Sequence, residues 1–293
     1  MKFAAALVLT FITITSAFGQ TQQSPPTLKI VTEDPNLPSE LFYGATKVKP
    51  LRLRPGTNQR ITWEDKDAFI VQQYIDFLNR MPDQGGYEAW LAKLNQCPVS
   101  EIDDPKSAVD CGRTDVSASF FRSPEFQLKG YYLLRFYKVS LGRLPTYAEF
   151  KPDMGLVTGQ TGEEFLAKRA AFPGTFVTRT EFKNRYDALS NSDYVTKLSQ
   201  TTGVTLSNAN ALLSDLNAGR KTRAEVLREI VESQSVYDKF YNEAFVAMEY
   251  FGYLKRDPEP EGFNAWLDYL NKTSDYRTMV WGFAYSPEYR NRF

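Results

Sequence analysis

The chain has no histidine among its 293 residues. This absence excludes serine or cysteine catalysis with a histidine base, histidine-ligated metal sites and imidazole switches near neutral pH. The chain also lacks net charge, because 35 lysine and arginine residues balance 35 aspartate and glutamate residues. A nucleic-acid-binding surface needs an excess of cations to neutralise phosphates. We therefore expect no nucleic-acid partner.

An apolar run long enough to cross a bilayer is also missing. The longest apolar stretch, Phe3–Thr15, follows Lys2 and precedes Ala17-Phe18-Gly19, which has small residues at both positions that a signal peptidase needs. This pattern predicts a secretory signal peptide over residues 1–19. We expect an exported protein, secreted, extracellular or periplasmic, with no transmembrane segment and a net charge of −1 after cleavage.

Cysteine is scarce, and both residues of this type lie close together. Cys97 and Cys111 bracket residues 98–110, an insertion that a later copy of the same motif lacks. In an oxidising compartment this arrangement predicts a disulfide; two free thiols or a redox pair are the alternatives. The insertion is acidic and matches no EF-hand spacing, so we expect a solvated loop, with a calcium site as the alternative. Its charged residues are Glu101, Asp103, Asp104, Lys106 and Asp110.

Residues 20–66 are rich in proline, which disfavours long helices. We predict an extended arm over this segment. Val48–Arg54 and Gln59–Thr62 flank a Pro-Gly-Thr-Asn sequence and form a weak hairpin pattern. Thr62-Trp63-Glu64-Asp65 then resembles a capping box, and we expect a helix to begin there.

The most informative feature is an internal repeat. Residues 69–95 align without a gap onto residues 245–271, with eleven of 27 positions identical, and each copy is followed by Ser-Pro-Glu and an aromatic residue. Two degenerate copies lie between them. We therefore predict an all-α protein in which residues 67–293 form one continuous body of tandem helical repeats. The four predicted units are residues 67–127, 128–186, 187–240 and 241–293.

The recurring residues have structural interpretations. Ile70, Tyr74, Phe77, Leu78 and Met81 follow a helical period and predict one buried stripe. We expect the arginine of each copy to lie in the last helical turn and the proline to end the helix. We expect the glycine to allow a turn and the tryptophan to be buried. Each Ser-Pro pair should begin a new helix, with a long helix running on from Ser123. These motif residues are Arg80, Pro82, Gly86, Trp90, Ser123, Pro124, Arg143, Pro145, Arg256, Pro258, Gly262, Trp266, Ser286 and Pro287.

This motif resembles the bacterial family called domain of unknown function 4214. The resemblance rests on Arg80-x-Pro82, Gly86, Trp90 and the Ser-Pro-Glu ending, and is closer still in residues 254–290. It implies an all-helical fold, similar to the helical domain of phycobilisome linker polypeptides. It also implies an exported or cell-surface protein, and it assigns no active-site residue.

No catalytic, cofactor-binding or metal-binding set of residues stands out. We expect a non-catalytic module that binds a protein or a glycan at the cell surface. Its contact surface should consist of what differs between units, first the 98–110 loop and then the basic arm at Lys47, Lys49, Arg52 and Arg54. The alternative is a histidine-free carbohydrate-active enzyme, a hydrolase or lyase, with paired carboxylates about 5–10 Å apart in an aromatic-lined groove.

Overall fold

The structure is a computed structural model that describes residues 28–31, 40–43, 46–47, 62–104, 106, 109–159 and 161–292. The predicted signal peptide, the 48–61 hairpin pattern and the basic residues Lys49, Arg52 and Arg54 lie outside these residues. In the N-terminal part, a small antiparallel sheet has the strand order β1-β2-β3. Its strands are β1 (Leu28–Val31), β2 (Glu40–Tyr43) and β3 (Thr46–Lys47).

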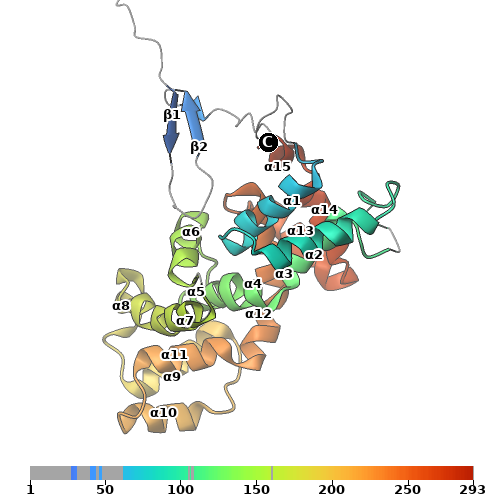
Figure 1. Cartoon of the computed structure of the whole chain (residues 1–293). Helices are drawn as coiled ribbons and strands as arrows, with labels where there is room; N and C mark the ends of the chain where they lie inside the picture. The colour runs from blue at the N-terminus through green and yellow to red at the C-terminus, as the bar shows by residue number, and fades with distance from the viewer. Residues whose placement is uncertain are drawn as a thin grey trace, which may run out of the picture.

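From Lys66 onward the described chain is helical, which confirms the predicted all-α repeat body (Figure 1). The first unit contains α1 (Lys66–Gln73), the π-helical turn η1 (Tyr74–Leu78), α2 (Gln84–Gln96), α3 (Arg113–Arg122) and α4 (Pro124–Phe126). The second contains the π-helical turn η2 (Gln127–Tyr131), α5 (Tyr132–Leu141), α6 (Tyr147–Leu156), α7 (Gly162–Phe176) and α8 (Thr180–Tyr186). The third contains α9 (Asn191–Thr202), α10 (Ala209–Asn217) and α11 (Arg223–Glu232). The last contains α12 (Gln234–Glu249), the π-helical turn η3 (Tyr250–Leu254), α13 (Pro260–Thr273), α14 (Tyr276–Ala284) and α15 (Pro287–Arg290).

Consecutive units are joined through continuous helices. The helix predicted from Ser123 is observed: the Ser123 hydroxyl accepts a hydrogen bond from the backbone N–H of Phe126 at 3.1 Å, Pro124 occupies the first helical position, and α4, η2 and α5 follow without a break. A second continuous stretch, α12 with η3, begins after Ser233. A helix end would interrupt the ladder of backbone hydrogen bonds at the boundary between units. Because the helix runs on instead, it fixes one unit rigidly to the next.

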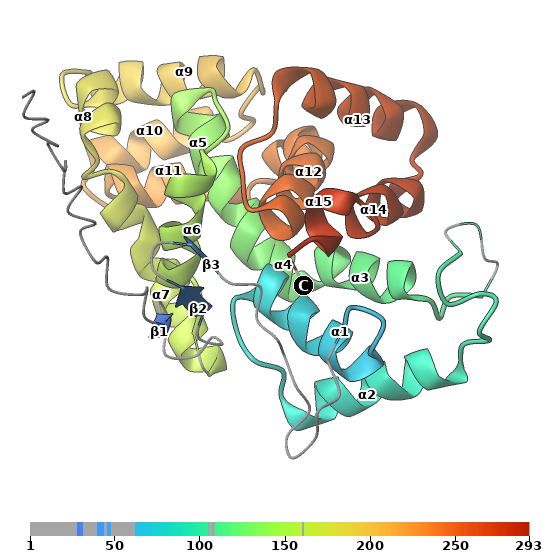
Figure 2. The ribbon, with the colours of Figure 1, turned by 90° about the horizontal axis from the view of Figure 1, so that it is seen from above.

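The units gather into two lobes. Figure 2 shows α6–α11 on one side and the first and last units together on the other, with α5 and α12 passing between them. The first and last units share a core in which Phe77 lies 5.0 Å from Tyr253 between ring centroids. The repeat therefore brings its two most similar copies into direct contact, although about 170 residues separate them.

The contact between these two copies resembles that of a two-fold symmetric dimer. The Arg122 guanidinium lies 4.4 Å from the centre of the Tyr276 ring, and Arg113 lies beside Tyr285. The repeat alignment places Arg122 opposite Tyr285 and Arg113 opposite Tyr276, so each contact maps onto the other when the copies are exchanged. Such reciprocal contacts are the signature of an isologous interface, here formed within one chain.

Two expectations at the first helix are wrong. The helix begins at Lys66 rather than at Trp63, because Thr62 donates its backbone N–H to Asp65 at 2.7 Å in a turn that precedes the helix. Met81 is 46% exposed, whereas the other four residues of the predicted stripe are buried. The helix already ends after Leu78, where Asn79 adopts a left-handed conformation, so Met81 lies outside the helical period.

The predicted disulfide is present between Cys97 and Cys111, with 5.2 Å between the Cα atoms. It joins the residue after α2 to the segment before α3. We expect reduction to lower the free energy of unfolding by up to about 3 kcal/mol, the chain-entropy value for a loop of about 15 residues. Helicity should persist, because α13 and α14 make the corresponding connection without cysteine. Thermal melts followed by circular dichroism, with and without reductant, measure both effects, and loss of the helical signal on reduction would contradict the prediction.

Candidate functional site

Three sets of residues, which we call repeat junctions, recur in the first, second and last units. In each, an arginine forms two parallel hydrogen bonds to a glutamate and lies over a tyrosine ring. In the first unit, Arg80 Nε and Nη2 are each 2.9 Å from the Glu125 carboxylate, and its guanidinium is 4.9 Å from the centre of the Tyr74 ring. The other two sets are Arg143 with Glu181 and Tyr137, and Arg256 with Glu288 and Tyr250.

The arginines therefore do not act on a helix dipole as predicted. Each follows the left-handed residue that ends its helix, Asn79, Gly142 or Lys255. From there each guanidinium also donates to the carbonyl of the next residue, at 3.0 Å for Arg80. Two-point pairing between guanidinium and carboxylate is strong and directional. The junction thus ties the end of one helix to a glutamate in the first turn of another, 45 residues away in the first unit. In the first and last units this second helix begins with the Ser-Pro-Glu sequence.

The electrostatics of the first junction follow from this geometry. Burial alone would raise the pKa of Glu125, but hydrogen bonds from Arg80 and Lys129 outweigh burial and lower it to about 2. Lys129 Nζ lies 2.6 Å from the same carboxylate. The glutamate therefore stays ionised at any physiological pH, which suits a structural ion pair and not a proton-transfer group.

The prolines and glycines of the motif have roles that differ from the predicted ones. Pro82, Pro145 and Pro258 do not end a helix; each lies immediately before the N-cap residue of the next one. Gly86 is needed for space rather than for a turn, because a Cβ atom there would lie 2.2 Å from the Tyr74 hydroxyl. Gly262 has the same relation to Tyr250, at 2.4 Å.

The second unit shows why its copy of the motif lacks this glycine. The Tyr137 hydroxyl is directed to Asp153, at 2.8 Å, and therefore does not occupy the space that a glycine would leave. Glu149 stands at the glycine position, caps its helix with Thr146 and pairs with Arg143 at 2.7 Å. One substitution thus replaces a packing requirement with an ion pair.

The two tryptophans of the motif are less buried than expected. Trp90 and Trp266 occupy equivalent positions, 5.6 Å from Phe120 and 5.7 Å from Phe283 between ring centroids, but both are only partly buried. Each belongs to an amphipathic helix that covers the core with one face, so part of the indole meets solvent.

The acidic 98–110 loop is not simply solvated. Asp103 pairs with Arg113 at 2.6 Å and contacts the hydroxyl of Tyr285, and Asp110 pairs with Lys93 at 3.2 Å. Two of its four acids therefore attach the loop to the first and last units. Within the described part of the chain, no three Asp, Glu or Cys side chains gather in a way that could hold a metal ion.

Among the buried carboxyl groups of the first and last units, Asp76 and Glu249 differ most in their partners. The side chain of Asp76 is 1% exposed and meets Lys255 at 3.0 Å, the Tyr289 hydroxyl at 2.8 Å and Arg292 at 3.4 Å. Burial by itself would raise the pKa of Asp76, but these cations and hydrogen bonds outweigh burial and lower it.

Glu249 is the opposite case. It is fully buried, and neither carboxylate oxygen has a hydrogen-bond partner among the described residues. Burial raises its pKa well above the usual 4.5. The equivalent residue of the first unit is Gln73, whose amide oxygen accepts a hydrogen bond from Ser117. The repeat gave no sign of either buried acid, because neither Asp76 nor Glu249 is shared between copies.

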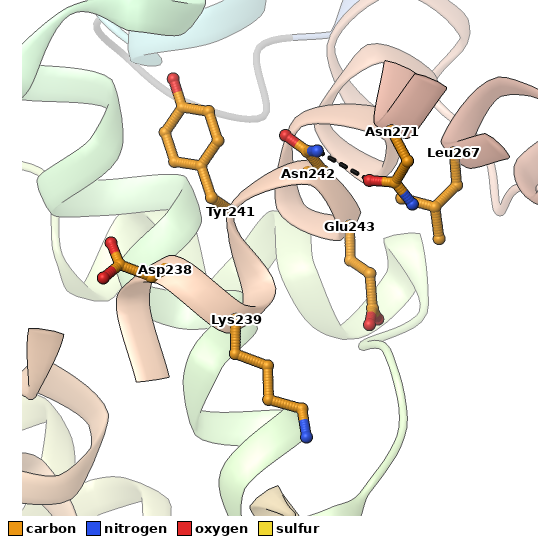
Figure 3. A pocket seen from close by; sticks show the side chains of 7 residues that line it. All are labelled: Asp238, Lys239, Tyr241, Asn242, Glu243, Leu267 and Asn271. Atoms are coloured by element: carbon orange, nitrogen blue, oxygen red, sulfur yellow. Dashed lines mark hydrogen bonds between the residues drawn. The ribbon is translucent and has the colours of Figure 1, made fainter. Parts of the chain in front are cut away.

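A polar groove of about 410 Å³ lies along α12 and α13 (Figure 3). Its volume is within the range of small-ligand sites. At its centre, the Asn242 amide donates to the Asn271 amide oxygen at 2.7 Å and bridges the two helices. The groove is lined by Asp238, Lys239, Tyr241, Asn242, Glu243, Leu267 and Asn271.

The two acids of this groove do not form a catalytic pair. Asp238 and Glu243 are five residues apart on one helix, which separates their directions by about 140°. Figure 3 shows the two side chains diverging from α12. Glu243 is also paired with Lys138 at 2.6 Å, and Asp238 accepts a hydrogen bond from Gln234 at 2.7 Å.

The fold and the junctions define an all-helical tandem-repeat protein. Residues 232–293 match the model of a protein family described as Domain of unknown function (DUF4214). The match covers α12 to α15 and confirms, for the last unit, the resemblance found in the sequence. No curated protein and no solved structure matches the chain. In the described residues, no helix has the length and apolar character that a membrane crossing requires.

Proposed function

We propose that the protein is an exported, non-catalytic binding module whose repeats build a rigid body and whose variable positions contact the partner. The observation that carries this proposal is the use of the motif residues. The arginine, glutamate and tyrosine of all three repeat junctions are paired with one another, whereas a catalytic site needs groups that converge on a cleft. A binding role requires only a surface held in a fixed shape.

The groove along α12 and α13 is the best candidate for the contact surface. The groove has room for a ligand, and its lining includes side chains that differ between units. One of them is Asn242, whose counterpart in the first unit is Lys66. The 98–110 loop is the weaker candidate, because Asp103 and Asp110 already pair within the fold.

The alternative is a histidine-free carbohydrate-active enzyme. One observation favours it: Asp238 and Glu243 both line the groove. Their divergence and the ion pair of Glu243 with Lys138 argue against this alternative, because a general acid and base must reach the same substrate bond.

Incubation of the purified full-length chain with cell-wall polysaccharides separates the two functions. We expect partner capture by crosslinking at the cell surface and no release of reducing sugar or unsaturated products. The variants Asp238→Asn and Glu243→Gln provide the control. Turnover by the unaltered protein that either variant abolishes would show an enzyme, and absence of any crosslinked surface partner would refute the binding module.

A further inference from the structure

The groove differs from the corresponding region of the first unit at five of its seven lining positions, and the change from Lys66 to Asn242 bears most directly on its space. There, Lys66 extends from α1 and donates to the Leu94 carbonyl at 2.8 Å and to the Asn95 side chain at 3.2 Å. In the last unit the shorter Asn242 stands at the position of Lys66 and reaches only Asn271, the counterpart of Asn95. The space that a lysine side chain would cross between the two helices is therefore left to the groove.

The amide pair presents both kinds of hydrogen-bonding group. Since the Asn242 amide nitrogen donates to the Asn271 oxygen, the Asn242 oxygen remains as an acceptor and the Asn271 nitrogen as a donor. Neither has another partner among the described residues. Asp238 adds a second acceptor, and Leu267 adds a partly buried apolar wall.

The charges of the groove oppose an ionic ligand. Lys239 is the one cation among the lining residues, and it donates a hydrogen bond to the Gly203 carbonyl at 3.0 Å. It also shares the groove with two acids, Asp238 and Glu243, so an anion would find no free positive group. Glu243 is already neutralised by Lys138, which weakens the attraction for a cation. A ligand hydroxyl both donates and accepts, and thus suits an adjacent amide donor and acceptor.

We propose that this groove binds a neutral carbohydrate, with Asn242 and Asn271 as the residues that hydrogen-bond its hydroxyl groups. The proposal rests on the binding module proposed above and names the ligand class of its site. The same amide pair that links α12 to α13 would then orient the sugar, while Leu267 contacts its C–H face.

The first unit supplies a blocking substitution. Asn242→Lys copies Lys66, which the fold already accommodates at the equivalent position, and should place the lysine across the groove. We expect the full-length protein to bind members of an array of neutral oligosaccharides, and Asn242→Lys to reduce that binding at least tenfold with an unchanged melting temperature. Asn264→Lys adds the same charge on an exposed position of α13 outside the groove and should bind as the unaltered protein does.

A second variant keeps the test independent of folding effects. Asn271→Asp preserves size at an exposed position and replaces the amide donor with an acceptor, so binding should again fall. Binding that survives both variants, binding confined to charged oligosaccharides, or no binding on the array would overturn the carbohydrate proposal. Surface crosslinking in the last two cases would still support a binding module with a different ligand or surface.

Discussion

Asp76→Ala should lower the free energy of unfolding by about 3 kcal/mol, the lower end of the cost of leaving a buried charge without its partner, because the cations left behind are only partly buried. The carboxylate joins the first unit to Lys255, Tyr289 and Arg292 of the last unit, and its side chain is almost fully buried. Burial lowers the pKa of Lys255 to about 8, so its ammonium is still charged at neutral pH and would lose its partner in the variant. Urea unfolding at pH 7, followed by circular dichroism, measures the change.

A matched surface substitution provides the control. Asp268 pairs with Lys272 at 2.6 Å, but both side chains are more than 60% exposed. Asp268→Ala should therefore cost less than about 1 kcal/mol. Equal effects of the two substitutions would show that the Asp76 cluster does not hold the first and last units together.

Acid should remove the contribution of Asp76. Because the pKa of Asp76 is lower in the folded protein than in the unfolded chain, the carboxylate stabilises the fold above about pH 4, and this stabilisation is lost as the pH falls through the folded value. The difference between the unaltered protein and Asp76→Ala should therefore shrink below pH 4.

Glu249→Gln should make the protein more stable than the unaltered chain at pH 7, by an amount that grows with pH. Glu249 is buried without a hydrogen-bond partner for its carboxylate, so the folded state favours the protonated form and its pKa is raised. The unfolded chain releases this proton near pH 4.5, whereas the folded protein retains it to higher pH. Stability of the unaltered protein should therefore fall, relative to the variant, by about 1.4 kcal/mol per pH unit between those two values.

Unfolding curves of both proteins between pH 4 and pH 9 test this prediction. Below pH 4.5 the two should have similar stability, because Glu249 is then protonated in both states. Glu261→Gln, at an exposed position of α13, should change stability by less than about 0.5 kcal/mol throughout. Parallel curves for the unaltered protein and Glu249→Gln would mean that the carboxyl group is not held in its protonated form.

Much of the fold was predictable from the sequence. The stripe from Ile70 to Leu78 follows the helical period, Ser123 and Pro124 are a cap and a first helical residue, and the self-alignment revealed the repeat. Two cysteines that flank one insertion also predicted their own disulfide. These features depend on residues within about one helical turn of each other, or on comparison of the chain with itself.

The candidate site was far less predictable. Asn271 belongs to the repeat, but only its approach to Asn242 creates the polar centre of the groove. A comparison of Lys66 with Asn242 could have indicated the difference, although nothing in the sequence shows that the lysine spans two helices. The pairing of the motif's polar residues with one another is visible only in the structure.

By itself, the sequence determined the helical repeat, the helix starts and the disulfide, because side-chain periodicity, capping and covalent pairing act over short distances or through few alternatives. Tertiary structure alone decided which glutamate each arginine meets, that Gly86 makes room for the Tyr74 hydroxyl, and that Asp76 is paired whereas Glu249 is not. Those outcomes depend on how units far apart in the chain pack against each other. Burial and the position of opposite charges then set the energy of each group, and neither quantity is encoded in local sequence.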